Sequence, residues 1–148
     1  MTYATLTHPT PPSHHLRAAL AARGKTPLAL ALTIVAALLV VSSGAIHFYL
    51  WDIAYRHVAT LGPLFLVQGI SAVIVALALV LLRWGVVIVA ALGLMVGTLI
   101  GFVLVLTTGL FGFKLGFVSG WATLTVVAEC LATVVLVTAG ALLWRETA

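Results

Sequence analysis

The stretch GVVIVAALGLMVGTLIGFVLVLTTGL, residues 85 to 110, decides the fold, because it is apolar throughout and contains no charged residue. A helix of about 20 apolar residues, rising about 1.5 Å per residue, is long enough to cross a hydrocarbon layer of roughly 30 Å. Three further runs have the same character, and they cover residues 27 to 50, 63 to 82 and 121 to 144. The sequence therefore predicts an all-α integral membrane protein, folded as an antiparallel four-helix bundle.

The composition supports this fold class and leaves no stretch long enough for a separate soluble domain. Hydrophobic residues make up 64% of the chain and charged residues only 7%, whereas a soluble domain has about 25% charged residues. The formal net charge is +4. In a soluble protein this excess would suggest a nucleic-acid partner, but here the basic residues flank the apolar runs. We therefore expect no nucleic-acid partner.

The placement of the basic residues predicts the orientation in the membrane. Residues 1 to 26 are expected to form a disordered, basic cytoplasmic segment, and residues 27 to 148 the four-span transmembrane domain. Cytoplasmic loops carry an excess of Lys and Arg, so the end of the bundle with more of them should face the cytoplasm. Five basic residues belong to one end, which should therefore hold both termini in the cytoplasm: Arg17, Arg23, Lys25, Arg83 and Arg145. The outer end has only two, Arg56 and Lys114.

Glu129 is the residue that most needs an explanation, because an acidic side chain near the middle of a span costs about 2.5–3.5 kcal/mol. It shares a helix face with Thr125, four residues earlier. Gln68 and Ser71 on the second run, and His47 near the end of the first, lie at a similar depth in the outer half. The sequence therefore predicts a polar pocket in the outer half of the bundle, with these five residues as candidates for its lining.

Each of these residues also has a purely structural interpretation. Polar side chains within spans join helices through hydrogen bonds worth about 0.6–2 kcal/mol each, and this role is favoured for Gln68 and the threonines. For His47, near the end of its run, a position at the membrane interface is favoured. For Glu129 a functional role and a buried partnership with His47, Arg56 or Gln68 are equally open.

Two further patterns indicate contact surfaces. Gly93, Gly97 and Gly101 recur at four-residue spacing on the third run, which predicts a surface for close helix packing, either inside the monomer or across a homodimer. Asp52 and Arg56, four residues apart in the loop after the first run, are typical of a helical turn with a weak, exposed ion pair.

The segments GAIHFYLW, residues 44 to 51, and YRHVATLGPLFLVQ, residues 55 to 68, resemble small, uncharacterised four-span proteins frequent in high-GC actinobacteria. The resemblance covers these segments and the layout of the spans. It implies a bacterial inner membrane, and no established activity comes with it. It also draws attention to Tyr55, Arg56 and His57 in the outer loop.

The motifs of common catalytic sites are absent from the sequence. It contains no phosphate-binding glycine loop, no HExxH and no nucleophile elbow. The single cysteine, Cys130, cannot form an internal disulfide and is interpreted as a small, buried apolar filler. We therefore expect no enzyme, no metal and no cofactor; haem in particular is disfavoured, because only His47 belongs to a span.

Three classes of function follow from these observations. The favoured class is an accessory, assembly or lipid- or ligand-binding membrane protein, with membrane lipid and a homodimer or a partner membrane protein as its partners. The alternative is a small proton-coupled solute exporter that works as a dimer and uses Glu129. A membrane oxidoreductase that handles a quinone is a third class, supported only by His47 and the aromatic residues of the outer end.

Overall fold

The computed structural model describes residues 27–82, 85–116 and 118–147. Over these ranges the chain is helical, without a strand, and the predicted all-α class is confirmed. The predicted N-terminal segment, together with Arg83, lies outside the described residues. Four long helices and one short π-helical segment follow in order: α2 (Pro27–Leu50), η1 (Trp51–Tyr55), α3 (Leu61–Leu81), α4 (Gly85–Thr107) and α5 (Gly120–Thr147).

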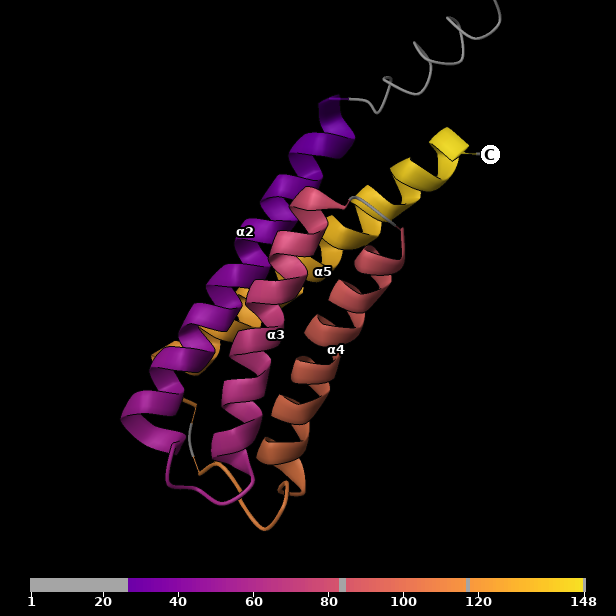
Figure 1. The fold of residues 1–148 in the computed structure, drawn as a ribbon. Coiled ribbons are helices and arrows are strands. Elements are labelled where there is room, and N and C mark those ends of the chain that lie inside the picture. Colours follow the sequence, from indigo (N-terminus) through magenta and orange to yellow (C-terminus); the bar gives the residue numbers. More distant parts are fainter. Residues whose placement is uncertain (1–26, 83–84, 117, 148) are drawn as a thin grey trace, which may run out of the picture.

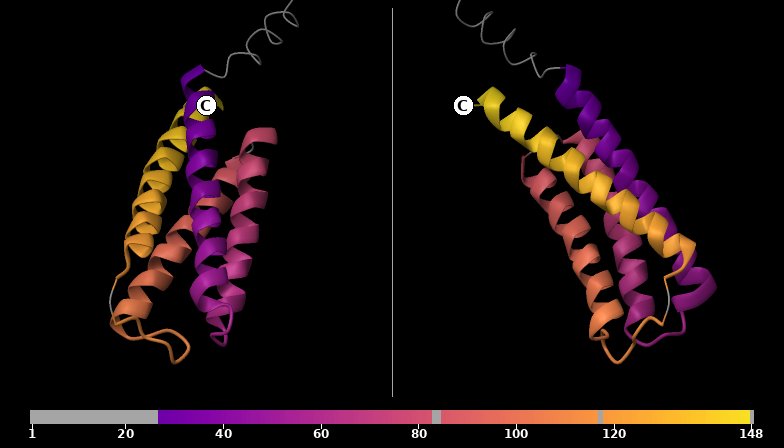
Figure 2. Two further views of the ribbon diagram at one scale, coloured as in Figure 1. Left: turned by 90° about the vertical axis from the view of Figure 1, so that its left-hand side faces the viewer. Right: turned by 180° about the vertical axis from the view of Figure 1, so that it is seen from behind.

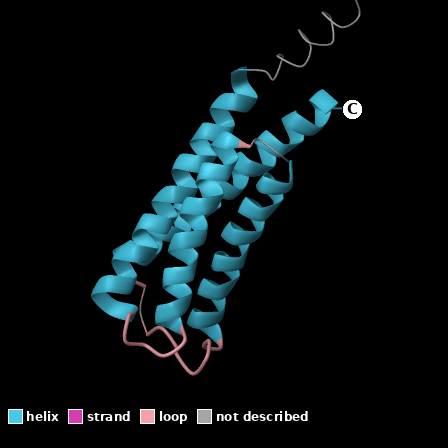
Figure 3. Cartoon of the chain, viewed as in Figure 1, coloured by secondary structure: helices cyan, strands magenta, loops and turns pink. Residues whose placement is uncertain are grey.

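The four long helices lie side by side, and the chain reverses its direction between consecutive helices (Figure 1). The connection between η1 and α3 and the connection between α4 and α5 lie at the same end, here called the loop end (Figure 3). The end of α3 and the start of α4 lie at the opposite end, here called the hairpin end, as do the start of α2 and the end of α5. Because of this arrangement, residues that are far apart in the sequence lie at the same height along the bundle.

All four helices are long and apolar enough to cross a membrane. The shortest, α3, has 21 residues and is therefore about 30 Å long at 1.5 Å per residue. The observed bounds differ from the prediction where loops begin. The first span continues through η1 to Tyr55, and α3 begins at Leu61, after Thr60 with a φ of 66°. The helix α4 ends at Thr107 rather than at 110, because Gly109 has a φ of 86° and turns the chain.

Small residues bring α2 and α3 into close contact. A Cβ placed on Gly44 of α2 would lie 2.7 Å from the Cβ of Ala72 and 3.2 Å from the carbonyl oxygen of Gly69, both on α3. A Cβ on Gly69 would lie 2.9 Å from the ring of Phe48. Because glycine has no side chain, the two backbones approach more closely here than any other residue allows.

The half of the bundle nearest the hairpin end is filled. Its buried apolar side chains come from all four helices, and most of them are small, so the helices pack closely. The largest of its almost completely buried members are Leu79, Met95 and Leu136. The complete cluster is Ala36, Ala37, Val40, Ala72, Ala76, Leu79, Val87, Ile88, Ala91, Met95, Ala132 and Leu136.

Candidate functional site

The half of the bundle nearest the loop end contains a pocket of about 450 Å³. In the left view of Figure 2, α4 runs away from α3 toward this end. Residues of α2, α3, α4 and α5 line the pocket, together with residues of the α4–α5 loop. Most of the lining is apolar, and the polar side chains among it are His47, Tyr55, Gln68, Thr98, Ser119, Thr125 and Glu129.

The carboxyl group of Glu129 is buried in the wall of this pocket and is only 1% exposed. The Ser43 hydroxyl of α2 donates a hydrogen bond of 2.9 Å to Glu129 Oε1. The side chain of Thr98, on α4, also interacts with this carboxyl group. Glu129 therefore joins α5 to α2 and α4. Its hydrogen-bond partner is Ser43 rather than His47, Arg56 or Gln68, the three candidates that the sequence suggested.

His47 is buried near the end of α2 and lines the same pocket. Its Nδ1 lies 2.9 Å from the carbonyl oxygen of Ser43. A carbonyl oxygen can only accept a hydrogen bond, so Nδ1 carries the proton and donates. In the neutral imidazole this leaves Nε2 as an acceptor. The ring packs against Phe65 of α3, with 5.1 Å between ring centroids.

Gln68 differs from the other polar residues of the pocket. Its side chain is 9% exposed, and Nε2 is the one buried side-chain polar atom in the described ranges that has no hydrogen-bond partner. Native proteins nearly always pair such groups, so each exception needs an explanation. The amide nitrogen therefore does not act as the interhelical hydrogen-bond donor that the sequence suggested.

Aromatic rings close the pocket at the loop end. Tyr55 of η1 stacks on Phe65, with 4.5 Å between centroids, and meets the edge of Phe113 at 5.9 Å. Phe113 and Leu110 exchange two backbone hydrogen bonds of 2.8 and 2.9 Å. This turn folds the loop back, so that Leu110, Phe111 and Phe113 all line the pocket.

The structure brings together four of the five predicted pocket residues, Glu129, Gln68, His47 and Thr125. Ser71 is not part of the lining, which corrects the prediction for that residue. Three residues turn a helix by about 300°, so Ser71 points about 60° away from Gln68. Neither Thr98 nor Ser43 was among the five candidates. Their positions on apolar helices gave no signal of which way their hydroxyl groups point.

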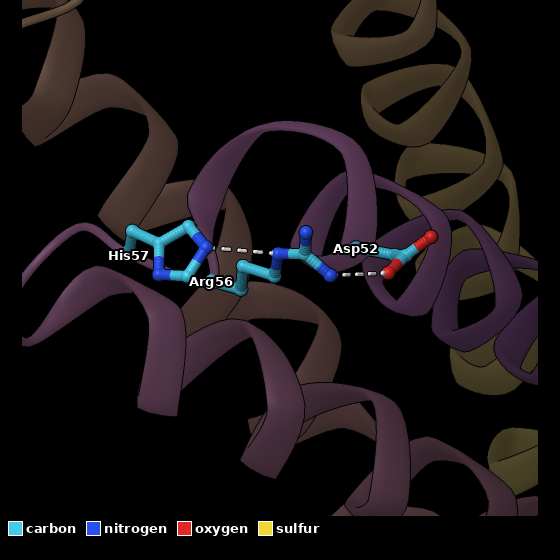
Figure 4. A network of polar contacts seen from close by, with 3 residues as sticks. All are labelled: Asp52, Arg56 and His57. Carbon is cyan, nitrogen blue, oxygen red and sulfur yellow. Dashed lines mark hydrogen bonds and ion pairs between the residues drawn. The ribbon is translucent and has the colours of Figure 1, made fainter.

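Of the three outer-loop candidates, only Tyr55 lines the pocket. Arg56 and His57 are exposed. Arg56 Nη1 lies 3.3 Å from Asp52 Oδ1, and Arg56 Nε donates a hydrogen bond of 3.1 Å to His57 Nε2 (Figure 4). The predicted exposed ion pair is thus confirmed, and it stands apart from the pocket.

The glycine stripe of α4, Gly93, Gly97 and Gly101, lines the pocket. No heavy atom of the described chain lies within 4 Å of a Cβ built on any of the three. Of the two predicted explanations for this stripe, close packing inside the monomer is therefore excluded, because no other described helix lies opposite it. Packing across a homodimer stays a prediction. The prediction for Cys130 is also wrong, because this residue of α5 is exposed rather than buried.

Within the described ranges, no group of three or more His, Cys, Asp or Glu residues is placed to hold a metal ion. No family model, no curated protein and no solved structure matches the chain.

Proposed function

We propose that this chain is a multi-pass membrane protein that binds a lipid or another apolar ligand in the pocket at the loop end. The observation that carries the proposal is an apolar pocket of about 450 Å³ with a few polar groups in its wall, among them Gln68 and Glu129. Ligand sites typically have volumes of about 300–1,000 Å³ and combine apolar walls with a few well-placed polar groups.

The outer surface of the helices supports insertion in a membrane. Large apolar side chains point outward from each helix, among them Leu38, Ile74, Val89 and Val134, all at least 60% exposed. A soluble monomer rarely exposes such large contiguous apolar patches, whereas hydrocarbon chains of lipid would cover them without cost. In this setting the four spans form an antiparallel bundle.

The charges support an orientation with the loop end outside a bacterial inner membrane and both termini in the cytoplasm. Arg56 and Lys114 lie in the loops of the loop end, and Arg145 lies at the hairpin end, where the sequence also puts the other basic residues. The pocket would then open in the outer half of the membrane. A pocket in this position is also compatible with an accessory or assembly role. In that role the protein would act alone, as a homodimer or with a partner membrane protein.

Native mass spectrometry of the protein, released from membranes in mild detergent, tests the proposal. We expect the wild-type protein to retain a stoichiometric ligand. Gly97→Leu should abolish retention, because the new side chain enters the pocket without a clash at its Cβ. Val96→Leu, at the neighbouring exposed position, is the matched control and should retain the ligand. A wild-type protein without any ligand, or equal retention by both variants, would overturn the proposal.

The proton-coupled exporter is the second candidate, and the burial of Glu129 in the pocket wall favours it. A single carboxyl group inside a membrane pocket is a typical site for coupling proton movement to ligand movement. In proteoliposomes with an imposed proton gradient, we expect Glu129→Gln to abolish proton-linked flux of a ligand. A folded Glu129→Gln protein that supports the wild-type flux would exclude this candidate.

A further inference from the structure

The unpartnered Nε2 of Gln68 indicates one chemical group of the ligand. This nitrogen carries two N–H donors and belongs to a side chain that lines the pocket. It is buried in the structure, and rotation of the terminal amide about its broad χ3 torsion would turn it toward the pocket. A buried donor without an acceptor is costly, so such an atom in a binding site is explained when the ligand supplies the acceptor. The missing group is therefore a hydrogen-bond acceptor that can enter an apolar pocket.

The charges around the pocket restrict the ligand further. Among the residues that the structure describes, neither Lys nor Arg belongs to the lining, whereas Glu129 does. A carboxylate or phosphate group inside the pocket would find no cation to pair with and would lie near the glutamate carboxyl. The acceptor is therefore a neutral oxygen, and a carbonyl is the strong neutral acceptor that membrane-soluble molecules carry.

The glycine stripe indicates the shape of the remainder of the ligand. Gly93 and Gly97 line the pocket and are also exposed, so the pocket reaches the surface of α4 within the apolar part of the helix. From Gly93 to Gly101 the stripe is about 12 Å long at 1.5 Å per residue. A chain of methylene or isoprenoid groups can lie in this track, where no side chain projects.

We propose that the ligand is a neutral molecule with a carbonyl oxygen attached to an apolar chain, and that Gln68 Nε2 donates a hydrogen bond to this oxygen while the chain lies along Gly93, Gly97 and Gly101. The proposal rests on the ligand-binding function proposed above. Two sources share this chemistry: the ester group of a glycerolipid and the ring carbonyl of an isoprenoid quinone.

Competition between matched probes tests the proposal on the wild-type protein. One pair is a phosphatidylcholine with ester-linked chains and its ether-linked analogue with the same chains. The other pair is decylbenzoquinone and decylbenzene. Equal amounts of the two members are offered to the full-length protein in detergent, and native mass spectrometry gives the ratio bound. We expect the carbonyl-containing member to be favoured at least about fivefold in one pair, and that pair identifies the source.

Two variants assign the preference to Gln68. Gln68→Met keeps an unbranched side chain of similar length but removes the donor, so the ratio should fall to about one while total retention persists. Ser71→Ala, on the same helix but outside the pocket, is the matched control and should keep the wild-type ratio.

Three results would overturn the proposal, and they can be told apart. Wild-type ratios near one in both pairs, with both members retained, would exclude the carbonyl while leaving the proposed binding function intact. A wild-type preference that Gln68→Met preserves would exclude Gln68 as the donor. No retention of any probe by the wild type would remove the proposed function and this inference together. The ratios measured on the wild-type protein do not depend on any variant. They can therefore refute the proposal even if Gln68→Met does not fold.

Discussion

The two halves of this bundle are built from the same four helices, yet one is filled and the other is hollow. Near the hairpin end, Leu79, Met95 and Leu136 meet small residues of the facing helices and fill the space between them. Near the loop end, α4 presents glycines and α5 presents Glu129, and a pocket of about 450 Å³ lies between them. The same four helices thus form a packed core where small side chains let them lie close together, and a pocket where α4 runs away from α3 (Figure 2).

The two sets of glycines repeat this contrast. Gly44 and Gly69 lie where α2 and α3 touch, so their missing side chains permit close contact. Gly93, Gly97 and Gly101 face the pocket, so their missing side chains leave space. The same residue type at helical positions therefore has opposite effects, and only the element opposite the glycine distinguishes them.

The largest expected effect tests the filled half against the hollow one with the same substitution. Leu136→Ala removes a completely buried side chain from the core and should lower the free energy of unfolding in detergent micelles by about 2–5 kcal/mol. Leu64→Ala, at a partly exposed position in the pocket wall, should lower it by less than about 1 kcal/mol. Equal losses would mean that the two halves are packed alike.

The two glycine sets can be compared in the same way. Gly44→Ala would bring its Cβ within 2.7 Å of Ala72 Cβ and should lower the free energy of unfolding by about 1–3 kcal/mol. The new Cβ of Gly97→Ala meets no atom of the described residues within 4 Å. This variant should raise the free energy of unfolding by up to about 1 kcal/mol, because alanine favours a helix. A loss of stability in Gly97→Ala would show that the stripe packs against another helix, for instance across a homodimer.

The hydrogen bond between α2 and α5 has a smaller expected effect. Ser43→Ala removes the donor to the buried Glu129 carboxyl group and should lower the free energy of unfolding by about 1–2 kcal/mol. Ser42→Ala is the control, because the Ser42 hydroxyl is exposed and bonds only the carbonyl oxygen of Leu38 in its own helix. That variant should change stability by about 0.5 kcal/mol or less. If the two serines were equivalent, the assignment of Ser43 to Glu129 would be wrong.

The smallest effect is expected at the surface of the loop end. Asp52→Asn breaks an ion pair whose side chains are 51% and 64% exposed, which should change the free energy of unfolding by less than about 0.5 kcal/mol. Ligand retention in native mass spectrometry should also stay at the wild-type level, because Asp52 and Arg56 lie outside the pocket. Lost retention would extend the binding site to the outer loop.

The residues that were predicted well and those that were predicted wrongly differ in a physical way. The four helices follow from uninterrupted apolar length, and the ion pair of Asp52 and Arg56 follows from spacing within one helical turn. These are local properties. The assignments of Ser71 and Cys130 were wrong, and the glycine stripe does not pack inside the monomer, because each assignment required knowledge of which helix face points inward. Helices that are apolar on every side carry almost no periodic signal for that direction.

By itself, the sequence determined the helical class and the number of long apolar helices. It also determined that polar residues are concentrated toward one end of the spans. These properties follow from apolar length and residue identity, which are read along the chain. Only the tertiary structure decided that Ser43 pairs with Glu129, that Gln68 lines the pocket while its Nε2 is buried without a partner, and that the glycines of α4 leave a space. Those facts depend on how helices distant in the sequence rotate and pack against one another, and small side chains such as Gly44 and Ala72 set that packing.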